Sequence, residues 1–460
     1  MTADRASLPE KLERGARWAV PVLIGLMAVH GVWAARGLFA DGSFYLLNIL
    51  STDTFLDFDP ARWFAPIVTQ APVLLASHLG VTDIAALIRF QSFGLIAIPL
   101  AIWVGALAAQ WRKPLYWAFV AMFAVVQLNS GFMAVGEYLL AYALVALSAA
   151  VLLREELLRW WQLAVLAVSA VVLLLSYEAL AHLGLVLLAI TVARIVGVRG
   201  MGPAGPRGKR AVLAVLAVLY ACAAALAVRS ILHPRDPFNA ANAADLLTPL
   251  KQDGQLVIST AIAVLAVGVL LIRGGARGNV LAVVLAVVLA VASTVLLLPA
   301  VWAAPALHYL ARTLAGLALF GLLCGAVLVQ IVTARRSPDG TPSPHPARLA
   351  WIAPFALVCA QIVPFTVHTA GFADWTAEFE QVVVSGSGTI PIAGSGLDPK
   401  ATASYGWAWT NPIMSTLLQQ NRDQGIIASA PAAAAASATW LPDPLPRPLP
   451  RFAKSTSLFP

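Results

Sequence analysis

The sequence predicts an all-α, polytopic membrane protein, and three observations predict it. Hydrophobic residues make up 60% of the 460 positions and charged residues only 11%, with a mean hydropathy of +0.81. Soluble domains carry about 25% charged residues, so an ordinary soluble enzyme is excluded. Long apolar runs recur through residues 18–368, and each can cross a hydrocarbon core about 30 Å thick. The basic residues lie in short loops between these runs, so the net charge of +8 reflects membrane topology, and no nucleic-acid partner is expected.

The N-terminus predicts a retained first membrane helix. Residues 1–17 are rich in basic side chains, and the apolar stretch Trp18–Ala35 is too long and too aromatic for the core of a cleavable signal peptide. No A-x-A cleavage site precedes a soluble domain. We therefore expect residues 1–17 to be a cytoplasmic N-terminus and residues 18–368 to form the transmembrane domain.

The apolar runs define about eleven transmembrane helices. They are expected near 18–36, 90–110, 114–129, 134–153, 160–176, 180–196, 211–230, 256–272, 279–299, 308–334 and 349–367. With the N-terminus inside, cytoplasmic segments and the helix ends beside them hold 18 of the 30 Lys and Arg residues, whereas the short outer loops hold six. This bias is the one that the positive-inside rule predicts. It places loops 197–210 and 335–348 in the cytoplasm and residues 369–460 outside, as an extracytoplasmic C-terminal region.

The stretch 61–79 is apolar but contains Pro66, Gln70 and Pro72. Counting it as a full span would put the basic pair Arg112 and Lys113 outside. We therefore predict an amphipathic or re-entrant helix at the outer face, within the first loop.

The first outer loop collects four carboxylates, Asp41, Asp53, Asp57 and Asp59, with no basic residue between Arg36 and Arg62. Such a loop is also typical of solvated turns, in which Asp is a common turn former. Asp41 differs because it closely follows the first helix, within reach of the membrane surface. It could act as a general base on an acceptor hydroxyl, or hold a divalent cation with Asp57 or Asp59 as the second carboxylate. No cofactor is certain from these residues.

Other ionisable residues mark the outer ends of later helices. Glu137 opens one helix, and Glu178 and His182 are four residues apart, which places them on one helical face as a candidate acid/base or ligand pair. Ionisable side chains in lipid are costly and usually face a cavity or a partner. Pairing that only stabilises the bundle is an equally open interpretation.

A second group lies near the outer end of the tenth predicted span. His308, Tyr309 and Arg312 are close in sequence, and the fork-shaped guanidinium of Arg312 suits a phosphate or a carboxylate partner. In the C-terminal region, Trp407 and Trp409 stand in the segment 405–412 beside amide and hydroxyl groups. They could stack on sugar rings, although Trp also settles at membrane interfaces.

The chain resembles the GT-C superfamily of polytopic membrane glycosyltransferases in three features. These are the outer-loop Asp after the first helix, the charged outer helix ends and the outer C-terminal appendage. The resemblance is architectural, covers residues 1–368, and is carried by Asp41, Glu137, Glu178 and the loop Asp53–Asp59. It implies a bacterial inner-membrane enzyme of the cell envelope that takes a sugar from a polyprenyl-phosphate donor at the outer membrane face. It also implies that Asp41 is the catalytic carboxylate and that Arg312 and Arg89 suit the lipid phosphate.

Two other functions remain open from the sequence. A transporter needs polar groups near the bilayer midplane, usually on broken helices, and no internal repeat of that kind is apparent. A scaffold protein would use the polar residues only to hold the bundle together. The gathering of polar groups at one membrane face favours the enzyme.

Overall fold

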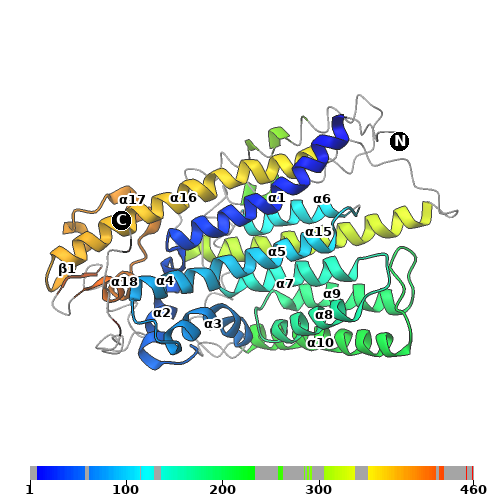
Figure 1. Ribbon diagram of the computed structural model, residues 1–460, viewed down its shortest axis with the longest axis horizontal. Coiled ribbons are helices and arrows are strands. Elements are labelled where there is room, and N and C mark those ends of the chain that lie inside the picture. Colours follow the sequence, from blue (N-terminus) through cyan, green and yellow to red (C-terminus); the bar gives the residue numbers. More distant parts are fainter. Residues whose placement is uncertain are drawn as a thin grey trace.

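The computed structural model describes residues 8–56, 62–113, 115–128, 136–233, 305–336, 351–420 and 424–428, with short pieces at 257–258, 260–262, 284, 287–289, 291–292, 452 and 458. The described chain is mostly helical, and its helices lie side by side in one elongated bundle (Figure 1). This confirms the predicted all-α class.

The N-terminal half contributes short and long helices in alternation. Their bounds are α1 Leu8–Trp33, η1 Arg36–Leu38, α2 Asp41–Thr52, α3 Phe64–His78, α4 Ile84–Ser92, η3 Phe93–Ala97, α5 Ile98–Ala109, α6 Tyr116–Met122, η4 Phe123–Leu128, α7 Glu137–Leu152, α8 Trp160–Leu173, α9 Leu180–Ile195 and α10 Arg207–Leu232. Segments η3 and η4 are π-helical turns that join α4 to α5 and extend α6. Such turns widen a helix locally and are frequent near functional sites.

The C-terminal half has two long helices and a small appendage. Its elements are α15 Pro305–Arg336, α16 Ile352–Ser385, β1 Thr389–Pro391, η5 Ile392–Gly394, α17 Pro399–Tyr405, α18 Asn411–Leu418 and β2 Ile426–Ala428. Strands β1 and β2 pair in parallel, with Thr389 opposite Ile426. In Figure 1 this appendage lies at the same end of the bundle as α2 and α4.

Five described helical segments are long and apolar enough to cross a membrane: Glu10–Trp33, Ile84–Ala109, Arg207–Leu232, Ala311–Val332 and Ile352–Ser385. Four shorter apolar segments accompany them: Tyr116–Leu128, Glu137–Leu152, Trp160–Leu173 and Leu180–Ile195. The predicted spans at 256–272 and 279–299 fall largely outside the described residues. The number of eleven spans therefore stays a prediction.

Helix α7 lies at the centre of the bundle. Apart from Leu147, all of its residues are buried, because they are apolar on every side of the helix. It packs against α5, α8 and α9. The single carboxylate of this helix, Glu137, is its first residue, so the apolar core holds that side chain at one end of the bundle.

Helix α3 occupies the stretch for which an amphipathic or re-entrant helix was expected. It is 15 residues long and is not among the described helices that are long enough to cross a membrane. The backbone N–H of Phe64 donates to the carbonyl of Leu175, 2.9 Å away, which ties the start of α3 to the segment between α8 and α9. Figure 1 places α3 at the end of the bundle with α2.

Helix α16 runs well beyond the predicted end of the last span. Its 34 residues continue to Ser385, so the boundary expected between residues 368 and 369 falls inside a helix. The buried positions Phe372, Trp375, Phe379 and Val383 repeat with helical spacing through the extension, although the polar residues between them end the hydrophobic run. At about 1.5 Å per residue the helix is about 51 Å long, longer than a hydrocarbon core of about 30 Å.

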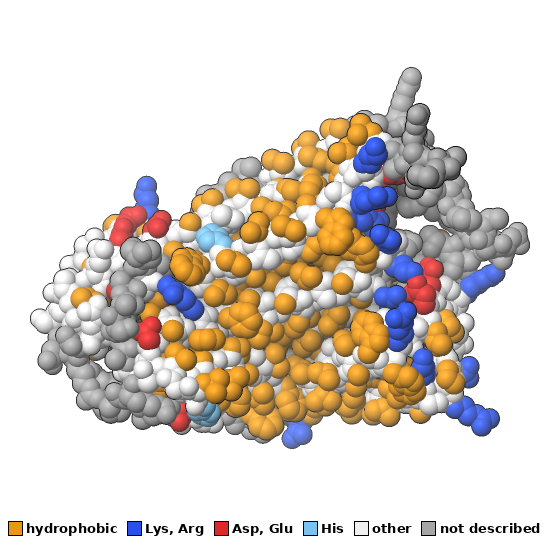
Figure 2. Space-filling view, in the orientation of Figure 1, with side chains coloured by type: hydrophobic (Ala, Val, Ile, Leu, Met, Phe, Trp, Pro, Cys, Tyr) orange, Lys and Arg blue, Asp and Glu red, His pale blue; other side chains and the backbone are white. Residues whose placement is uncertain are grey.

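The two ends of the bundle differ in charge. Figure 2 shows Lys and Arg side chains lining one end, apolar side chains over the broad middle, and Asp and Glu side chains mostly at the other end. The basic end carries Arg17, Lys113, Arg154, Arg194 and Lys209.

Basic side chains at this end hold backbone carbonyls. The buried Arg194 donates to the carbonyls of Leu152, Arg154 and Glu156, the first two at 2.7 and 2.6 Å. Lys209 donates to the carbonyl of Leu158 at 2.6 Å. These cations satisfy carbonyls at and after the C-terminus of α7, where the helix dipole favours positive charge.

Candidate functional site

The end of the bundle opposite the basic end holds a group of charged residues from five separate segments. We call Asp41, Arg62, Glu137, Glu178 and Arg312 the charged cluster. They come from the start of α2, the turn before α3, the start of α7, the turn before α9 and the second turn of α15. The helix starts of α2 and α7 therefore project two of the three carboxylates into the cluster, where partial positive charge at the helix N-termini favours them.

Asp41 is the first residue of α2 and follows a tight turn. The turn closes through hydrogen bonds from the N–H groups of Phe39 and Gly42 to the carbonyls of Arg36 and Phe39, at 3.1 Å each. A side chain at Gly42 would collide with the backbone carbonyl of Gly37, so only glycine fits there. Ala40 has a positive φ of 52°, which is strained for a residue with a Cβ.

The carboxyl group of Asp41 is poised between its neutral and ionised forms. Burial raises its pKa to about 6, the positive charge of Arg312 opposes that rise, and Glu137 adds to it. The residue is only half-buried in the described structure. A carboxyl with a pKa near 6 can exchange protons at neutral pH, as a general acid or base requires.

Glu137 is almost fully buried, with 4% of its surface exposed. Its Oε1 accepts a hydrogen bond from the Tyr45 hydroxyl at 2.7 Å, and its Oε2 lies 3.8 Å from Nη1 of Arg62. Within the described residues, Oε2 has no hydrogen-bond partner. Helix α2 thus supplies both Asp41 and, one turn later, the tyrosine that orients Glu137.

Arg62 and Glu178 form the closest ion pair of the cluster. Nε and Nη2 of Arg62 lie 2.9 and 2.7 Å from Oε1 of Glu178. Burial disfavours the ionised carboxylate, but the charge and hydrogen bonds of Arg62 outweigh it and hold the pKa of Glu178 below its usual range. Arg62 therefore links Glu178 to Glu137 across the cluster.

Arg312 enters the cluster from α15 and is surrounded by tyrosines. Its guanidinium lies 5.8 Å from the ring centre of Tyr138, and the Tyr142 hydroxyl donates to its backbone carbonyl at 2.7 Å. Tyr177 packs against both of these rings. The Arg62 guanidinium lies over the Tyr177 ring, 5.4 Å from its centre. Hydroxyls and cations thus stand beside three carboxylates, which suits a ligand that carries both hydroxyl groups and negative charge.

Glu178 and His182, expected as a candidate pair, have different neighbours in the structure. Glu178 faces Arg62, whereas the His182 ring packs edge-on against Phe320 of α15, with ring centres 5.5 Å apart. Four-residue spacing puts Glu178 and His182 on one helical face, but the Glu178 carboxylate instead pairs with the guanidinium of Arg62. His308 and Tyr309 are the fourth and fifth residues of α15, and their side chains fall outside the described residues.

Arg89 and the two candidate sugar-stacking tryptophans have other neighbours. Arg89 lies 4.6 Å from the ring centre of Trp33 and donates to the Leu458 carbonyl at 3.3 Å. Its described contacts are thus with α1 and the C-terminal segment, not with the three carboxylates.

Trp407 and Trp409 hold the segment that carries Asp41. The buried Trp407 packs edge-on against Phe39, with centres 6.2 Å apart, and Trp409 packs against Phe44 at 5.7 Å. Phe39 and Phe44 flank Asp41 in sequence. The appendage therefore clamps the start of α2 from outside the bundle, and a ring as buried as Trp407 has little face left for a sugar.

The possible metal ligands Asp57 and Asp59 lie outside the described residues. Among the residues that are described, no group of three His, Cys, Asp or Glu side chains is arranged to hold a metal ion. Asp53, from the same loop, instead lies 3.4 Å from Nε2 of His78 at the end of α3.

Arg62 and the tyrosines were not expected as site residues. Arg62 is the one basic residue between the acidic first loop and α3, which is a signal that sequence could have offered. Tyr45, Tyr138 and Tyr142 sit in apolar helices where aromatic residues are common, so only the fold distinguishes them.

Comparison of the chain with protein-family models, with curated proteins and with solved structures finds no match.

Proposed function

We propose that this chain is a membrane-embedded glycosyltransferase that transfers a sugar from a polyprenyl-phosphate donor to an acceptor hydroxyl at the membrane face that holds the charged cluster. The observation that carries the proposal is the convergence of Asp41, Glu137, Glu178, Arg62 and Arg312 at one end of an apolar bundle. Buried charge is costly, so a cluster drawn from five segments supports a binding or catalytic role.

In the proposed reaction the acceptor oxygen attacks the anomeric carbon of the sugar. The bond from that carbon to the phosphate oxygen breaks, and the electron pair leaves with the polyprenyl phosphate. Asp41 takes the acceptor proton, for which its half-buried position and its pKa of about 6 are suited. The guanidinium of Arg312, which acts on Asp41 electrostatically, stabilises charge that develops on the departing phosphate.

Glu137 and Glu178 have supporting roles in this proposal. Tyr45 and Arg62 fix Glu137 from two sides, and Arg62 is itself fixed by Glu178. Carboxylates held in this way suit hydroxyl groups of a sugar, because each oxygen accepts hydrogen bonds. We further propose that the cluster lies on the outer face and that the basic end is cytoplasmic, in agreement with the distribution of basic residues.

The placement of charge favours an enzyme over an ion-coupled transporter. Helix α7 has no charged residue after Glu137, α10 has none between Arg210 and Arg229, and α15 has none between Arg312 and Arg335. Transporter sites lie near the bilayer midplane, whereas the charged residues of these helices lie at their ends.

The test is a transfer assay on the protein in lipid nanodiscs, with a panel of polyprenyl-phosphate-linked sugars and release of the lipid phosphate as the readout. Loss of a general base costs about 10²–10⁴ in rate, so Asp41→Asn should be folded but nearly inactive. Asp53→Asn, the same change in the same loop, is the control and should retain activity. Full activity of Asp41→Asn would refute the role of Asp41, and inactivity of the wild-type protein with every donor would refute the proposed function.

A further inference from the structure

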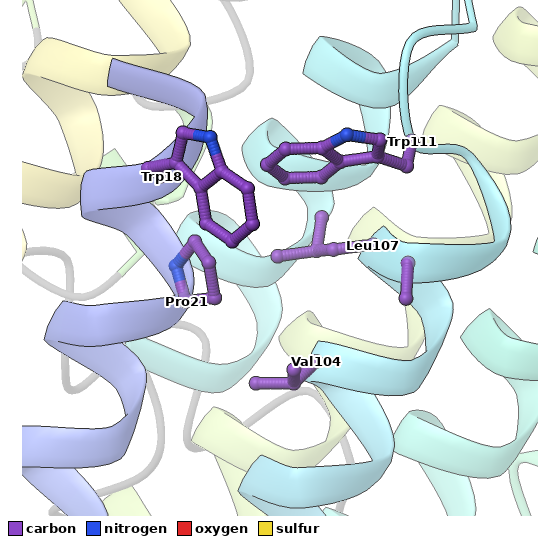
Figure 3. A pocket seen from close by; sticks show the side chains of 6 residues that line it. Trp18, Pro21, Val104, Leu107 and Trp111 are labelled. Atoms are coloured by element: carbon purple, nitrogen blue, oxygen red, sulfur yellow. The ribbon is translucent and has the colours of Figure 1, made fainter. Parts of the chain in front are cut away.

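A cavity of about 350 Å³ opens between α1 and α5 at the basic end, away from the charged cluster. Its lining is apolar: Trp18, Pro21, Val104, Leu107, Ala108 and Trp111. Figure 3 shows the Trp18 ring from α1 and the Trp111 ring from the turn after α5 at its upper rim, with Pro21, Leu107 and Val104 below them. The two rings meet edge-on, with centres 4.7 Å apart.

This cavity, called the groove below, has the surroundings of a membrane interface. Trp18 is 62% exposed and Ala108 is exposed, so the groove faces outward from the bundle. Tryptophan collects where hydrocarbon meets headgroups, because its ring is apolar and its N–H is polar. The apolar lining continues along α5 toward the middle of the bundle through Leu107 and Val104, in the direction that an acyl chain would take.

Two exposed arginines lie close in sequence to the tryptophans of the groove. Arg14 precedes Trp18 by four residues and therefore shares its face of α1, and Arg112 directly follows Trp111. Neither makes an ion pair in the described part of the chain, whereas the nearby Arg17 and Lys113 pair with Glu13 and Glu156. The two arginines are thus placed to meet an anionic headgroup above an apolar groove.

Arg112 lies in a tight turn after α5. Its φ of 63° lies in the left-handed region, which glycine or asparagine adopts more readily than arginine. The turn is closed by hydrogen bonds from the N–H groups of Trp111 and Lys113 to Ala108 and Gln110, at 3.1 and 2.9 Å. The Arg112 side chain is exposed at this turn.

We infer that this groove binds one anionic phospholipid, with an acyl chain between α1 and α5 against Trp18 and Trp111 and the headgroup phosphate at Arg14 and Arg112. The groove supplies apolar contact for the chain, and the two exposed arginines supply charge complementarity for the phosphate. This site is independent of the charged cluster.

The experiment uses native mass spectrometry of the full chain, delipidated in detergent and then exposed to equal amounts of phosphatidylglycerol and phosphatidylcholine with identical acyl chains. The wild-type protein should retain one phosphatidylglycerol in preference. Each basic residue near an anionic surface contributes about 1 kcal/mol, so the variant Arg14→Ala with Arg112→Gly should lose about 30-fold in that preference. Because glycine relieves the strain at position 112, its melting temperature should not fall.

Two further variants separate the groove from general electrostatics. Ala108→Phe fills the groove without a change in charge and should also reduce retention of phosphatidylglycerol. The double variant Arg199→Ala with Arg207→Ala removes two exposed charges near the start of α10 and should retain the wild-type preference.

Three outcomes of the lipid experiments would overturn the inference: no preference in the wild-type protein, an equal loss in both arginine double variants, or unchanged retention in Ala108→Phe. Inorganic phosphate at millimolar concentration is the last arm. Displacement of the lipid by phosphate alone would show that the groove contributes nothing and would also overturn it.

Discussion

The basic end and the charged cluster use arginine in opposite ways. At the basic end, Arg194 donates to the carbonyls of Leu152 and Arg154, and Lys209 to that of Leu158, so these cations complete the backbone. In the charged cluster, Arg62 faces two carboxylates, and Arg312 acts electrostatically on Asp41. Cations that satisfy carbonyls are engaged by the backbone, whereas charges arranged against other charges can be redistributed by a ligand.

The largest expected effect on stability is that of Arg62→Ala. It leaves Glu178 and Glu137 without their shared cation, and removal of one partner of a buried pair costs about 3–5 kcal/mol. We expect the lower end of that range, because the Glu178 side chain is 24% exposed. Chemical unfolding in detergent measures the change. Glu178→Gln in the same chain should recover part of the loss, and a loss unaffected by it would contradict the ion-pair explanation.

A second contrast concerns pH. The pKa of Asp41 is raised from 3.8 to about 6, so the folded protein binds this proton more tightly than the unfolded chain does. Stability that is fully present below pH 3.8 is therefore lost as the pH rises through about 6, by at most about 3 kcal/mol. Asp41→Asn should raise the melting temperature at pH 8 and not at pH 3.5, while transfer activity is lost. A lower melting temperature at pH 8 would show that the carboxylate stabilises the fold. In the wild-type protein, activity should rise as the pH passes about 6.

Arg194→Ala tests the basic end. It leaves carbonyls at the end of α7 and after it without their donor, and each unsatisfied buried group costs about 1–3 kcal/mol, less where water can enter. The loss should be nearly constant from pH 5 to 8, because backbone carbonyls do not titrate in that interval. Transfer activity per folded molecule should be unchanged. Reduced activity in a variant that is still folded would mean that the two ends are coupled.

The smallest effect compares two tyrosines. The Tyr45 hydroxyl donates to the Glu137 carboxylate at 2.7 Å, and the Tyr116 hydroxyl donates to the Arg17 carbonyl at 2.8 Å. Hydrogen bonds to charged groups contribute about 1.5–3 kcal/mol and neutral ones about 0.5–1.5 kcal/mol. Tyr45→Phe should therefore destabilise more than Tyr116→Phe in parallel melting experiments. Only Tyr45→Phe should alter the rate of transfer, and equal effects of both on rate would remove Tyr45 from the site.

The sequence predicted the helices best where hydropathy alone decides the boundaries. The expected spans 160–176 and 180–196 correspond closely to α8 and α9, because charges or turns bound them on both sides. The end of α16 could not be found in this way. Its extension is amphipathic, and its buried side is apparent only when the helix is known to have the appendage and the bundle to pack against.

The cluster was predictable in its parts and not in its pairing. Asp41, Glu137 and Glu178 stand out in sequence because few carboxylates border apolar runs, and the structure places all three at one end of the bundle. Arg62 pairs with Glu178, 116 positions away, because α3 packs beside α7 and α8. The four-residue spacing suggested His182 as the partner of Glu178. Spacing along the chain carries no information about residues that are distant in sequence.

The length of α16 also fixes an angle. Each residue of a helix advances the chain by about 1.5 Å and turns it by about 100°, so the rotational phase of the appendage depends on the number of residues after the membrane-spanning part. Trp407 and Trp409 contact Phe39 and Phe44 at the present phase. Deletion of a single residue between Thr369 and Ser385 would swing the appendage by more than a quarter turn away from α2. The number of residues in α16 therefore sets both the distance of the appendage from the bundle and the direction in which it faces.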